Sequence, residues 1–363
     1  MKRFPLSIFL ALGIGAALVE AQAPSGAAVE YKLGSFDRNG QTFIGVVVND
    51  SLVADLEQAS AAIEKASGSA RVSVPRDMKQ LIANYSQGGL EQRIAAVAAQ
   101  VTAQPRPAFV YDLKALRLRP PVAPTTILNA AVNYVEHANE MGVGAAPAAG
   151  AKPVEPPKPM PGMWERKPGD TRHNPYFFLK PTSVVIASGE AIRLPPGRDR
   201  IDWECELSVV VGRVATRVPV EQADAYIFGY TLQNDVSDRG GRNDSRHGSD
   251  WLIGKGHDTF APLGPFIVPK AFVPDPQKMP IKFTLSGKVM QDSNTDRMTH
   301  TVFELVEYAS HMMTLHPGDL ISTGSPAGVG TARATPIYFK DGDTSTCTIE
   351  SIGTLYNPVK ADK

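Results

Sequence analysis

The stretch that most constrains this chain spans residues 201–211, with the sequence IDWECELSVVV. Its density of Val, Leu and Trp predicts a β-strand, whose side chains alternate between two faces. Glu204 and Glu206 then share one face, while Trp203 and Cys205 point to the other. Two adjacent carboxylates repel each other and are costly to bury. A bound cation relieves both costs, and oxygen ligands favour Mg²⁺, Mn²⁺ or Ca²⁺ over Zn²⁺. The alternative is an edge strand that exposes both glutamates to solvent.

Length and composition set broader limits. A chain of 363 residues favours two domains, or one large domain with an appendage. The 37 basic residues balance the 37 acidic ones, and no basic stripe interleaved with aromatic residues is present, so we expect no nucleic-acid partner. The two cysteines, Cys205 and Cys347, fit no zinc spacing. We expect two buried free thiols, with a disulfide as the alternative.

The N-terminus has the pattern of a secretory signal. Lys2 and Arg3 precede an apolar run over residues 4–19, and small residues follow up to Ala21 and Ala23. We expect a signal peptide over residues 1–21 and a mature chain that begins near Gln22 or Pro24. An uncleaved anchor is the alternative, but the apolar run is short for a membrane-spanning helix. The protein is therefore expected to be exported to the periplasm of a Gram-negative bacterium, without stable membrane association after cleavage.

Residues 24–120 are expected to form a small α+β accessory domain. Strand-like runs at residues 31–34 and 42–48 flank a turn at residues 37–40, and a third run covers residues 52–56. Helical periodicity follows at residues 56–66 and 90–101. This region contains no evident catalytic constellation, which assigns the chemistry to residues 121–363.

The catalytic region opens with a candidate acid–base pair. Residues 135–142 predict a short helix ended by Gly142, and His137 and Glu140 share a face of it because they are three residues apart. A carboxylate beside an imidazole orients the ring and raises its basicity, which suits proton abstraction from water. A surface ion pair is the alternative. The following Ala/Pro/Gly-rich stretch indicates a mobile loop, so residues 133–163 together predict a lid.

Further candidates follow along the chain. Residues 226–233 predict a buried strand that delivers Asp235 at its end as a third carboxylate ligand. Lys255 stands between two glycines, where a backbone can approach a ligand closely. Residues 323–330, TGSPAGVG, form a Gly-rich turn whose hydroxyl and backbone amides suit an anion, although it lacks the ending of a phosphate loop.

These motifs, taken in order, resemble the fumarylacetoacetate hydrolase superfamily. They are Asn-Tyr-x-x-His-x-x-Glu, Phe-Leu-Lys-Pro, Asp-Trp-Glu-x-Glu-Leu, Asn-Asp-Val-Ser, Gly-Lys-x-x-Asp-Thr and Thr-Gly-Ser-Pro-Ala-Gly-Val-Gly, with residues 353–359 similar to the closing strand. The similarity runs from about Ile127 to Val359, and it points to the branch of acylpyruvases and 2-hydroxyhepta-2,4-diene-1,7-dioate isomerases. The departures are Ser237-Asp238-Arg239-Gly240 in place of Ser-Ala-Arg-Asp, Ser325 in place of Thr, and the long Pro/Ala stretch after the lid helix.

The resemblance implies a mixed β-roll in an α+β, mostly β, chain that forms a homodimer, with one Mg²⁺ or Mn²⁺ in each subunit. It implies Glu204, Glu206 and Asp235 as metal ligands, and His137, Glu140 and Lys255 as catalytic residues. Arg239, Ser325, Gly324 and Tyr134 would bind the substrate. The implied reaction is hydrolysis of a C–C bond in a small 1,3-diketo acid of the acylpyruvate type, with the metal at the 2-oxo acid end. Decarboxylation or keto–enol isomerisation at the same site, and a non-catalytic metal-stabilised binding protein, are the alternatives.

Overall fold

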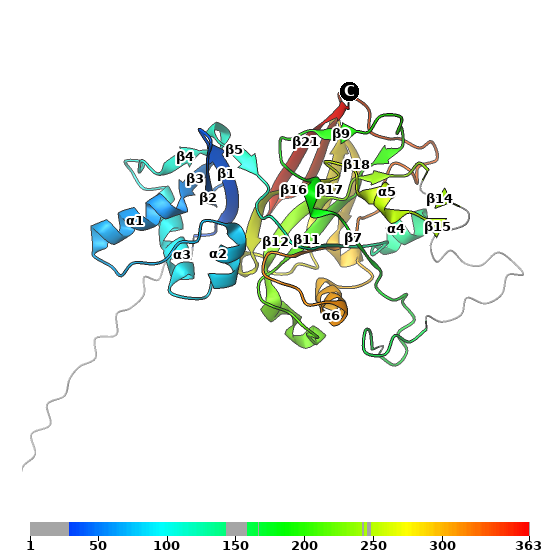
Figure 1. The fold of residues 1–363 in the computed structure, drawn as a ribbon, viewed down its shortest axis with the longest axis horizontal. Coiled ribbons are helices and arrows are strands. Elements are labelled where there is room, and N and C mark those ends of the chain that lie inside the picture. The colour runs from blue at the N-terminus through cyan, green and yellow to red at the C-terminus, as the bar shows by residue number, and fades with distance from the viewer. Residues whose placement is uncertain (1–28, 143–157, 166, 242, 245–247, 363) are drawn as a thin grey trace, which may run out of the picture.

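The computed structural model describes residues 29–142, 158–165, 167–241, 243–244 and 248–362 (Figure 1). The expected signal segment and the central part of the expected lid loop, residues 143–157, lie outside these ranges. Among the described residues, no helix combines the length and apolar character needed to cross a membrane.

One large sheet runs through the molecule. Twelve strands belong to it, and ten of them form a continuous path. In spatial order the ten are β4 (Val110–Asp112), β3 (Leu52–Asp55), β2 (Gln41–Val48), β1 (Lys32–Arg38), β16 (Ala261–Pro269), β12 (Ile227–Asn234), β11 (Cys205–Val211), β19 (Leu320–Ser322), β6 (Ile127–Ala130) and β7 (Phe177–Leu179). Off this path, β5 (Arg117–Arg119) pairs with β1 and β8 (Val185–Ala187) pairs with β16. The N-terminal strands therefore extend the sheet formed by strands of residues 121–363.

A second sheet of five strands packs against the first. Its order is β18 (Lys288–Asn294), β17 (Pro280–Leu285), β20 (Thr344–Ile349), β21 (Gly353–Ala361) and β9 (Ile192–Leu194). Between the two sheets Trp203 stacks on Phe283, with ring centroids 5.3 Å apart. Two short pairs complete the strands: β10 (Ile201–Asp202) with β13 (Ser237–Asp238), and β14 (Asn243–Asp244) with β15 (Gly248–Ser249). The mixed, sheet-dominated fold expected from the sequence is confirmed.

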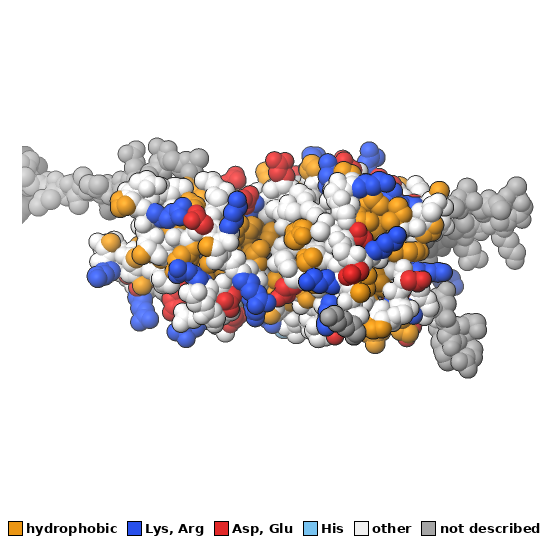
Figure 2. Space-filling model, turned by 90° about the horizontal axis from the view of Figure 1, so that it is seen from above, with side chains coloured by type: hydrophobic (Ala, Val, Ile, Leu, Met, Phe, Trp, Pro, Cys, Tyr) orange, Lys and Arg blue, Asp and Glu red, His pale blue; other side chains and the backbone are white. Residues whose placement is uncertain are grey.

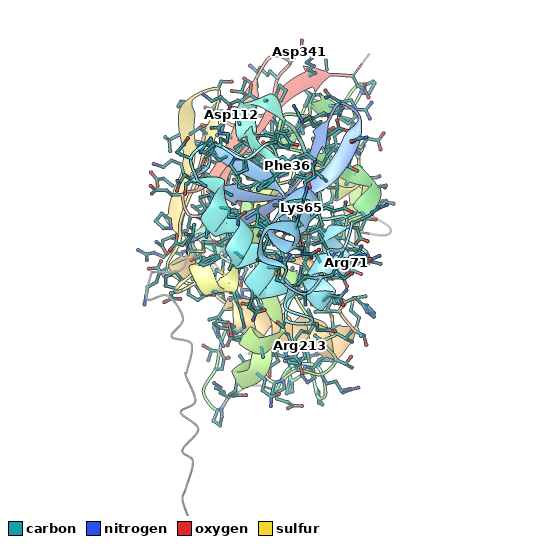
Figure 3. The ribbon with its side chains drawn as sticks, turned by 90° about the vertical axis from the view of Figure 1, so that its left-hand side faces the viewer. Phe36, Lys65, Arg71, Asp112, Arg213 and Asp341 are labelled. Atoms are coloured by element: carbon teal, nitrogen blue, oxygen red, sulfur yellow. A yellow bond between two sulfur atoms is a disulfide. The ribbon has the colours of Figure 1, made fainter. Side chains whose placement is uncertain are left out.

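The helices cover the opposite face of the large sheet at its N-terminal end (Figure 1). They are α1 (Leu56–Ser67), α2 (Met78–Asn84) and α3 (Leu90–Val101), and their apolar sides form one core with Val210, Leu263 and Leu320. Asp55 caps α1 by accepting a hydrogen bond from the backbone amide of Gln58, which explains where that helix begins. Figure 3 views this end of the molecule, with Lys65 near the end of α1 on the viewer's side.

Three further helices lie within residues 121–363: α4 (Val135–Glu140), α5 (Trp251–Lys255) and α6 (Val302–Met312). Short 3₁₀ helices join other elements: η1 (Leu113–Ala115), η2 (Thr182–Val184), η3 (Val220–Tyr226), η4 (Lys270–Phe272) and η5 (Thr295–Arg297). On the face shown in Figure 2, basic and acidic side chains are intermixed, as the balanced composition suggests.

The central acidic stretch differs from the prediction in two respects. The expected continuous strand is interrupted, because Trp203 and Glu204 lie between β10 and β11. The alternative of a solvated edge strand is wrong, since β11 pairs with β12 on one side and β19 on the other, and all its residues are buried. Alternation along β11 places Glu206 on the same face as Val210. The acidic site therefore lies on the helix-covered face of the sheet, farther along β11.

The expectation of two free thiols is also wrong. Cys205 and Cys347 form a disulfide across 142 residues of sequence, with their Cα atoms 5.5 Å apart and both side chains fully buried. Strand alternation directs Cys205 towards the second sheet, where β20 presents Cys347. Two residues so far apart in sequence become neighbours only through the packing of the sheets, which sequence spacing does not reveal.

Candidate active site

Three buried carboxylates converge at one end of β11 and β12. Glu206 belongs to β11, Glu204 precedes that strand, and Asp235 follows β12 directly. Each of the three offers an oxygen that lies within 4.8 Å of the oxygens of the other two. The backbone amide of Asp235 donates to the carbonyl of Glu204 at 2.8 Å, so the strand pairing itself aligns these residues. The predicted ligand set is therefore brought together.

Two buried lysines neutralise part of this charge. Lys255, the last residue of α5, donates to Glu204 Oε2 at 2.6 Å, to Asp235 Oδ2 at 2.5 Å and to Ser237 Oγ at 2.7 Å. Lys180 follows β7 and donates to Asp235 Oδ1 at 2.5 Å and to the carbonyl of Val236 at 3.0 Å. The Phe-Leu-Lys-Pro motif contained Lys180, but nothing in that motif assigned it a role.

Helix α4 places the His137–Glu140 pair beside the three carboxylates. His137 Nδ1 and Glu140 Oε1 are 2.7 Å apart, and His137 Nε2 lies 3.9 Å from Glu204 Oε1. Only 3% of His137 is exposed, which is too little for a solvated surface pair. Because Nδ1 is held by Glu140, Nε2 is the ring nitrogen that faces the acidic group.

The Gly-rich turn was expected to offer its amides to a bound anion. Instead, three of them bind carboxylates of the protein itself. The amide of Gly324 donates to Glu206 Oε2 at 3.0 Å, that of Gly328 to Glu140 Oε2 at 2.9 Å, and that of Gly330 to Asp202 Oδ1 at 2.7 Å. Gly324 has φ +90°, a conformation that L side chains rarely adopt, and an added Cβ would lie 2.8 Å from the Cβ of Asn133. This turn therefore orients the side chains of Glu206, Glu140 and Asp202.

Asp202 links this turn to Arg239. Besides Gly330, the Asp202 side chain accepts hydrogen bonds from the amides of Trp203 at 2.9 Å and Thr331 at 3.1 Å, and from Arg239 Nε at 3.0 Å. Arg239 also donates to Glu204 Oε1 at 2.5 Å. Arg239, predicted to bind the substrate carboxylate, is thus an ion-pair partner of a predicted metal ligand in this structure. Asp202 and Ser237 belong to the Asp-Trp-Glu-x-Glu-Leu and Asn-Asp-Val-Ser motifs, but neither motif assigned them a role.

Tyr134 and Ser325, also predicted to bind the substrate, are both buried but differ in their hydrogen bonding. Tyr134 is fully buried in the hydrophobic core, and its hydroxyl has no hydrogen-bond partner among the described residues. Ser325 Oγ accepts a hydrogen bond from Gln291 Nε2 at 2.8 Å. Their role in substrate binding stays a prediction.

Glu204 and Glu206 have pKa values shifted in opposite directions although they are neighbours. Burial alone would raise the pKa of Glu204, but Arg239, Lys255 and His137 hold it well below its usual range. Burial, followed by repulsion from Asp235 and Glu204, raises the pKa of Glu206 well above its usual range. Burial lowers the pKa of Lys180 to about 8, against the attraction of Asp235. Glu206 is therefore the carboxylate whose negative charge is least compensated.

This uncompensated charge is the fit test for a divalent cation. Among the described residues, Glu204, Glu206 and Asp235 are the group able to offer three carboxylate oxygens to one ion. Hard oxygen donors of this kind suit Mg²⁺ or Mn²⁺. A cation would relieve the repulsion that raises the Glu206 pKa, so the residues present fit such an ion.

Comparison with known proteins places this site in a family. The sequence-family model of the fumarylacetoacetate (FAA) hydrolase C-terminal region matches residues 126–360 of this chain. The mitochondrial oxaloacetate tautomerase Fahd2a of Rattus norvegicus is 32% identical over 287 residues, which cover 79% of this chain and 80% of the relative. The mitochondrial oxaloacetate tautomerase FAHD2A of Bos taurus is 36% identical over 264 residues, covering 73% and 74%.

Solved structures agree. Maleylpyruvate hydrolase from Sphingobium sp. SYK-6, in complex with manganese(II) and pyruvate, superimposes with a TM-score of 0.65 at 27% identity, covering 92% of this chain and 100% of that one. The 5-carboxymethyl-2-hydroxymuconate delta-isomerase from Mycobacterium smegmatis gives a TM-score of 0.61 at 29% identity, covering 92% and 99%. The chain therefore belongs to the fumarylacetoacetate hydrolase family, among relatives that are hydrolases, isomerases and tautomerases.

Proposed function

We propose that this protein is a divalent-metal-dependent hydrolase that cleaves a C–C bond in a small acylpyruvate-type 1,3-diketo acid. The observation that carries the proposal is the buried His137–Glu140 pair beside the three carboxylates. Binding a metal needs the carboxylates alone, and a 2.7 Å contact that orients His137 Nε2 towards them adds a positioned base.

In the proposed hydrolysis, the carboxylates hold the metal, and His137 and Glu140 activate water. A divalent cation held by Glu204, Glu206 and Asp235 would supply Lewis-acid stabilisation to the oxygens of a 2-oxo acid. His137 Nε2 takes a proton from water, and Glu140 stabilises the resulting imidazolium through Nδ1–H. The water oxygen bonds to the distal carbonyl carbon of the substrate. The C–C bond then breaks, its electron pair passes to the enolate of pyruvate, and a carboxylic acid leaves.

Lys255 suits the stabilisation of that enolate. Its ammonium group is buried and lies within hydrogen-bond distance of two of the three carboxylates, so it reaches the place where oxygen charge develops. A proton returned from the imidazolium to the enolate carbon gives pyruvate and restores His137.

The second candidate is keto–enol tautomerisation of a 2-oxo acid at the same site. It is favoured by the relatives from Rattus norvegicus and Bos taurus, which are named as oxaloacetate tautomerases. In this reaction His137 would take a proton from the carbon next to the ketone, and a proton would be added at oxygen. No water is consumed, so the same base serves both reactions.

One experiment separates these functions. Purified protein is assayed for loss of acetylpyruvate and for enol-to-keto conversion of oxaloacetate, with Mg²⁺, with Mn²⁺ and with EDTA. The proposal expects metal-dependent release of pyruvate and acetate, abolished by EDTA. Oxaloacetate conversion without acetylpyruvate cleavage would replace the hydrolase with the tautomerase. Metal binding without turnover of either compound would leave the non-catalytic binding protein.

A further inference from the structure

A row of aromatic rings leads from the protein surface to the candidate active site. Tyr176, Phe178 and Lys180 are two residues apart along β7 and its flanking residues, so their side chains lie on the same face of the strand. Trp251 and Lys255 are four residues apart on α5 and share one of its faces. The two faces meet, so each presents aromatic residues outward and a lysine inward to the carboxylates.

The contacts in this row are continuous. The rings of Tyr176 and Trp251 have centroids 5.7 Å apart, and those of Trp251 and Phe178 stack at 4.9 Å with an interplanar angle of 28°. Lys255 Nζ lies 4.8 Å from the centroid of the Phe178 ring. Half of Tyr176 is exposed, at 50%, whereas Lys255 is only 2% exposed. The row thus spans the distance from solvent to the residue that binds Glu204 and Asp235.

This arrangement differs from an ordinary core contact. Phe178 and Trp251 are half-buried, and Leu252, which follows Trp251 on α5, is 67% exposed. Covering this exposed apolar surface would be favourable, because the free energy falls when apolar area is removed from water. The rings offer apolar surface to an alkyl or aryl group, and the partial negative charge on their faces disfavours a carboxylate.

We propose that Tyr176, Trp251 and Phe178 form a subsite for an apolar acyl tail of the substrate. This inference rests on the proposed function and narrows its substrate class. The polar 2-oxo acid end would lie at the carboxylates, and the alkyl or aryl tail of the acyl group would lie along the rings. The preferred substrate is then an acylpyruvate with an extended apolar tail rather than a dicarboxylic acid such as oxaloacetate.

The test is a chain-length series. The value of kcat/KM is measured with Mg²⁺ for acetylpyruvate, butanoylpyruvate and hexanoylpyruvate. Each methylene buried on the rings should raise it by about fourfold, the equivalent of about 0.8 kcal/mol. A flat or falling series with intact acetylpyruvate cleavage would overturn the subsite and leave the hydrolase standing.

A binding series gives the same answer without turnover. Oxamate resembles the 2-oxo acid end, and N-butyl and N-hexyl oxamate add an apolar tail. Calorimetry in the presence of Mg²⁺ should show affinity rising with tail length. If the acylpyruvates are not cleaved but N-hexyl oxamate binds more tightly than oxamate, the subsite stands and the hydrolase fails. If the three oxamates bind equally, the subsite fails whatever the reaction.

Variants assign the effect to the rings. The measured quantity is the ratio of kcat/KM for hexanoylpyruvate to that for acetylpyruvate, which corrects for any general loss of activity. Trp251→Ala, with Phe178→Leu as a milder second variant, should lower this ratio at least about tenfold. Tyr356→Ala is the matched control, because Tyr356 is also an exposed aromatic residue, at 43%, on β21. Equal ratios in all the variants and the wild type would refute the assignment.

Discussion

The substitution Glu206→Gln should change the stability of the protein in opposite directions with and without metal. Glu204 is paired with Arg239 and Lys255, whereas the hydrogen bond to Glu206 comes from the backbone amide of Gly324. The pKa of Glu206 is raised by burial and by repulsion from Asp235 and Glu204. Glutamine keeps the shape and the acceptor oxygen but removes the charge.

The magnitudes follow from the geometry. The three ligand oxygens lie within 4.8 Å of one another. At an effective dielectric constant of about 20, two like charges at that separation repel by roughly 3 kcal/mol. The nearby lysines cancel part of this, so the metal-free variant should gain about 1–3 kcal/mol. A divalent cation interacts with the same carboxylate at shorter range and with twice the charge, so metal affinity should fall by about 10²-fold or more.

Thermal unfolding measures both effects. In EDTA, Glu206→Gln should melt a few degrees above the wild type, and in excess Mg²⁺ it should melt below it. Calorimetric titration with Mg²⁺ supplies the affinity. Glu350→Gln, at an exposed position on the surface, is the control and should change neither value. Equal stabilisation of wild type and Glu206→Gln by Mg²⁺, or a variant less stable in EDTA, would refute the electrostatic reasoning.

Three further predictions address other parts of the molecule. His137→Ala should lower acylpyruvate cleavage by about 10²–10⁴-fold with little change in Mg²⁺ affinity, and Glu140→Gln should lose less; near-full cleavage would exclude His137 as the base. Burial lowers the pKa of His300 to about 4, so the unfolded chain binds more protons there below about pH 6.5. Stability should therefore fall by up to about 3 kcal/mol between pH 6.5 and 4, and a pH series of denaturant midpoints should be flatter in this range for His300→Gln. Cys347→Ala should cost about 2–5 kcal/mol in a denaturant melt, with an unchanged midpoint as the contrary result.

The sequence predicted those parts of the site that follow from local periodicity. Alternation placed Glu204 and Glu206 near each other, and the three-residue spacing placed His137 beside Glu140. The buried strand ending at Asp235 was likewise visible as an apolar run. Each of these signals depends on a few neighbouring residues, whose geometry a strand or helix fixes.

The remaining features depend on contacts between distant segments. Lys180 and Asp202 approach the carboxylates only after β7 and β10 have paired with their partners. The amides of Gly324 and Gly330 were correctly recognised as anion-binding, but the anions are side chains of the protein itself. Only the folded structure shows that Glu206 and Asp202 accept the hydrogen bonds from these amides.

The buried position of the disulfide determines when the bond can form during folding. Both sulfur atoms are fully buried between the two sheets, where an oxidant or reductant in solution cannot reach them in the folded protein. The bond must therefore form while the chain is still folding, and its presence in a purified sample reports the compartment in which folding took place. Disulfides form in the periplasm and rarely in the bacterial cytosol. We propose export, and mass spectrometry of the unreduced protein from its native cell should find Cys205 and Cys347 fully cross-linked, whereas the same chain retained in the cytosol should carry two thiols.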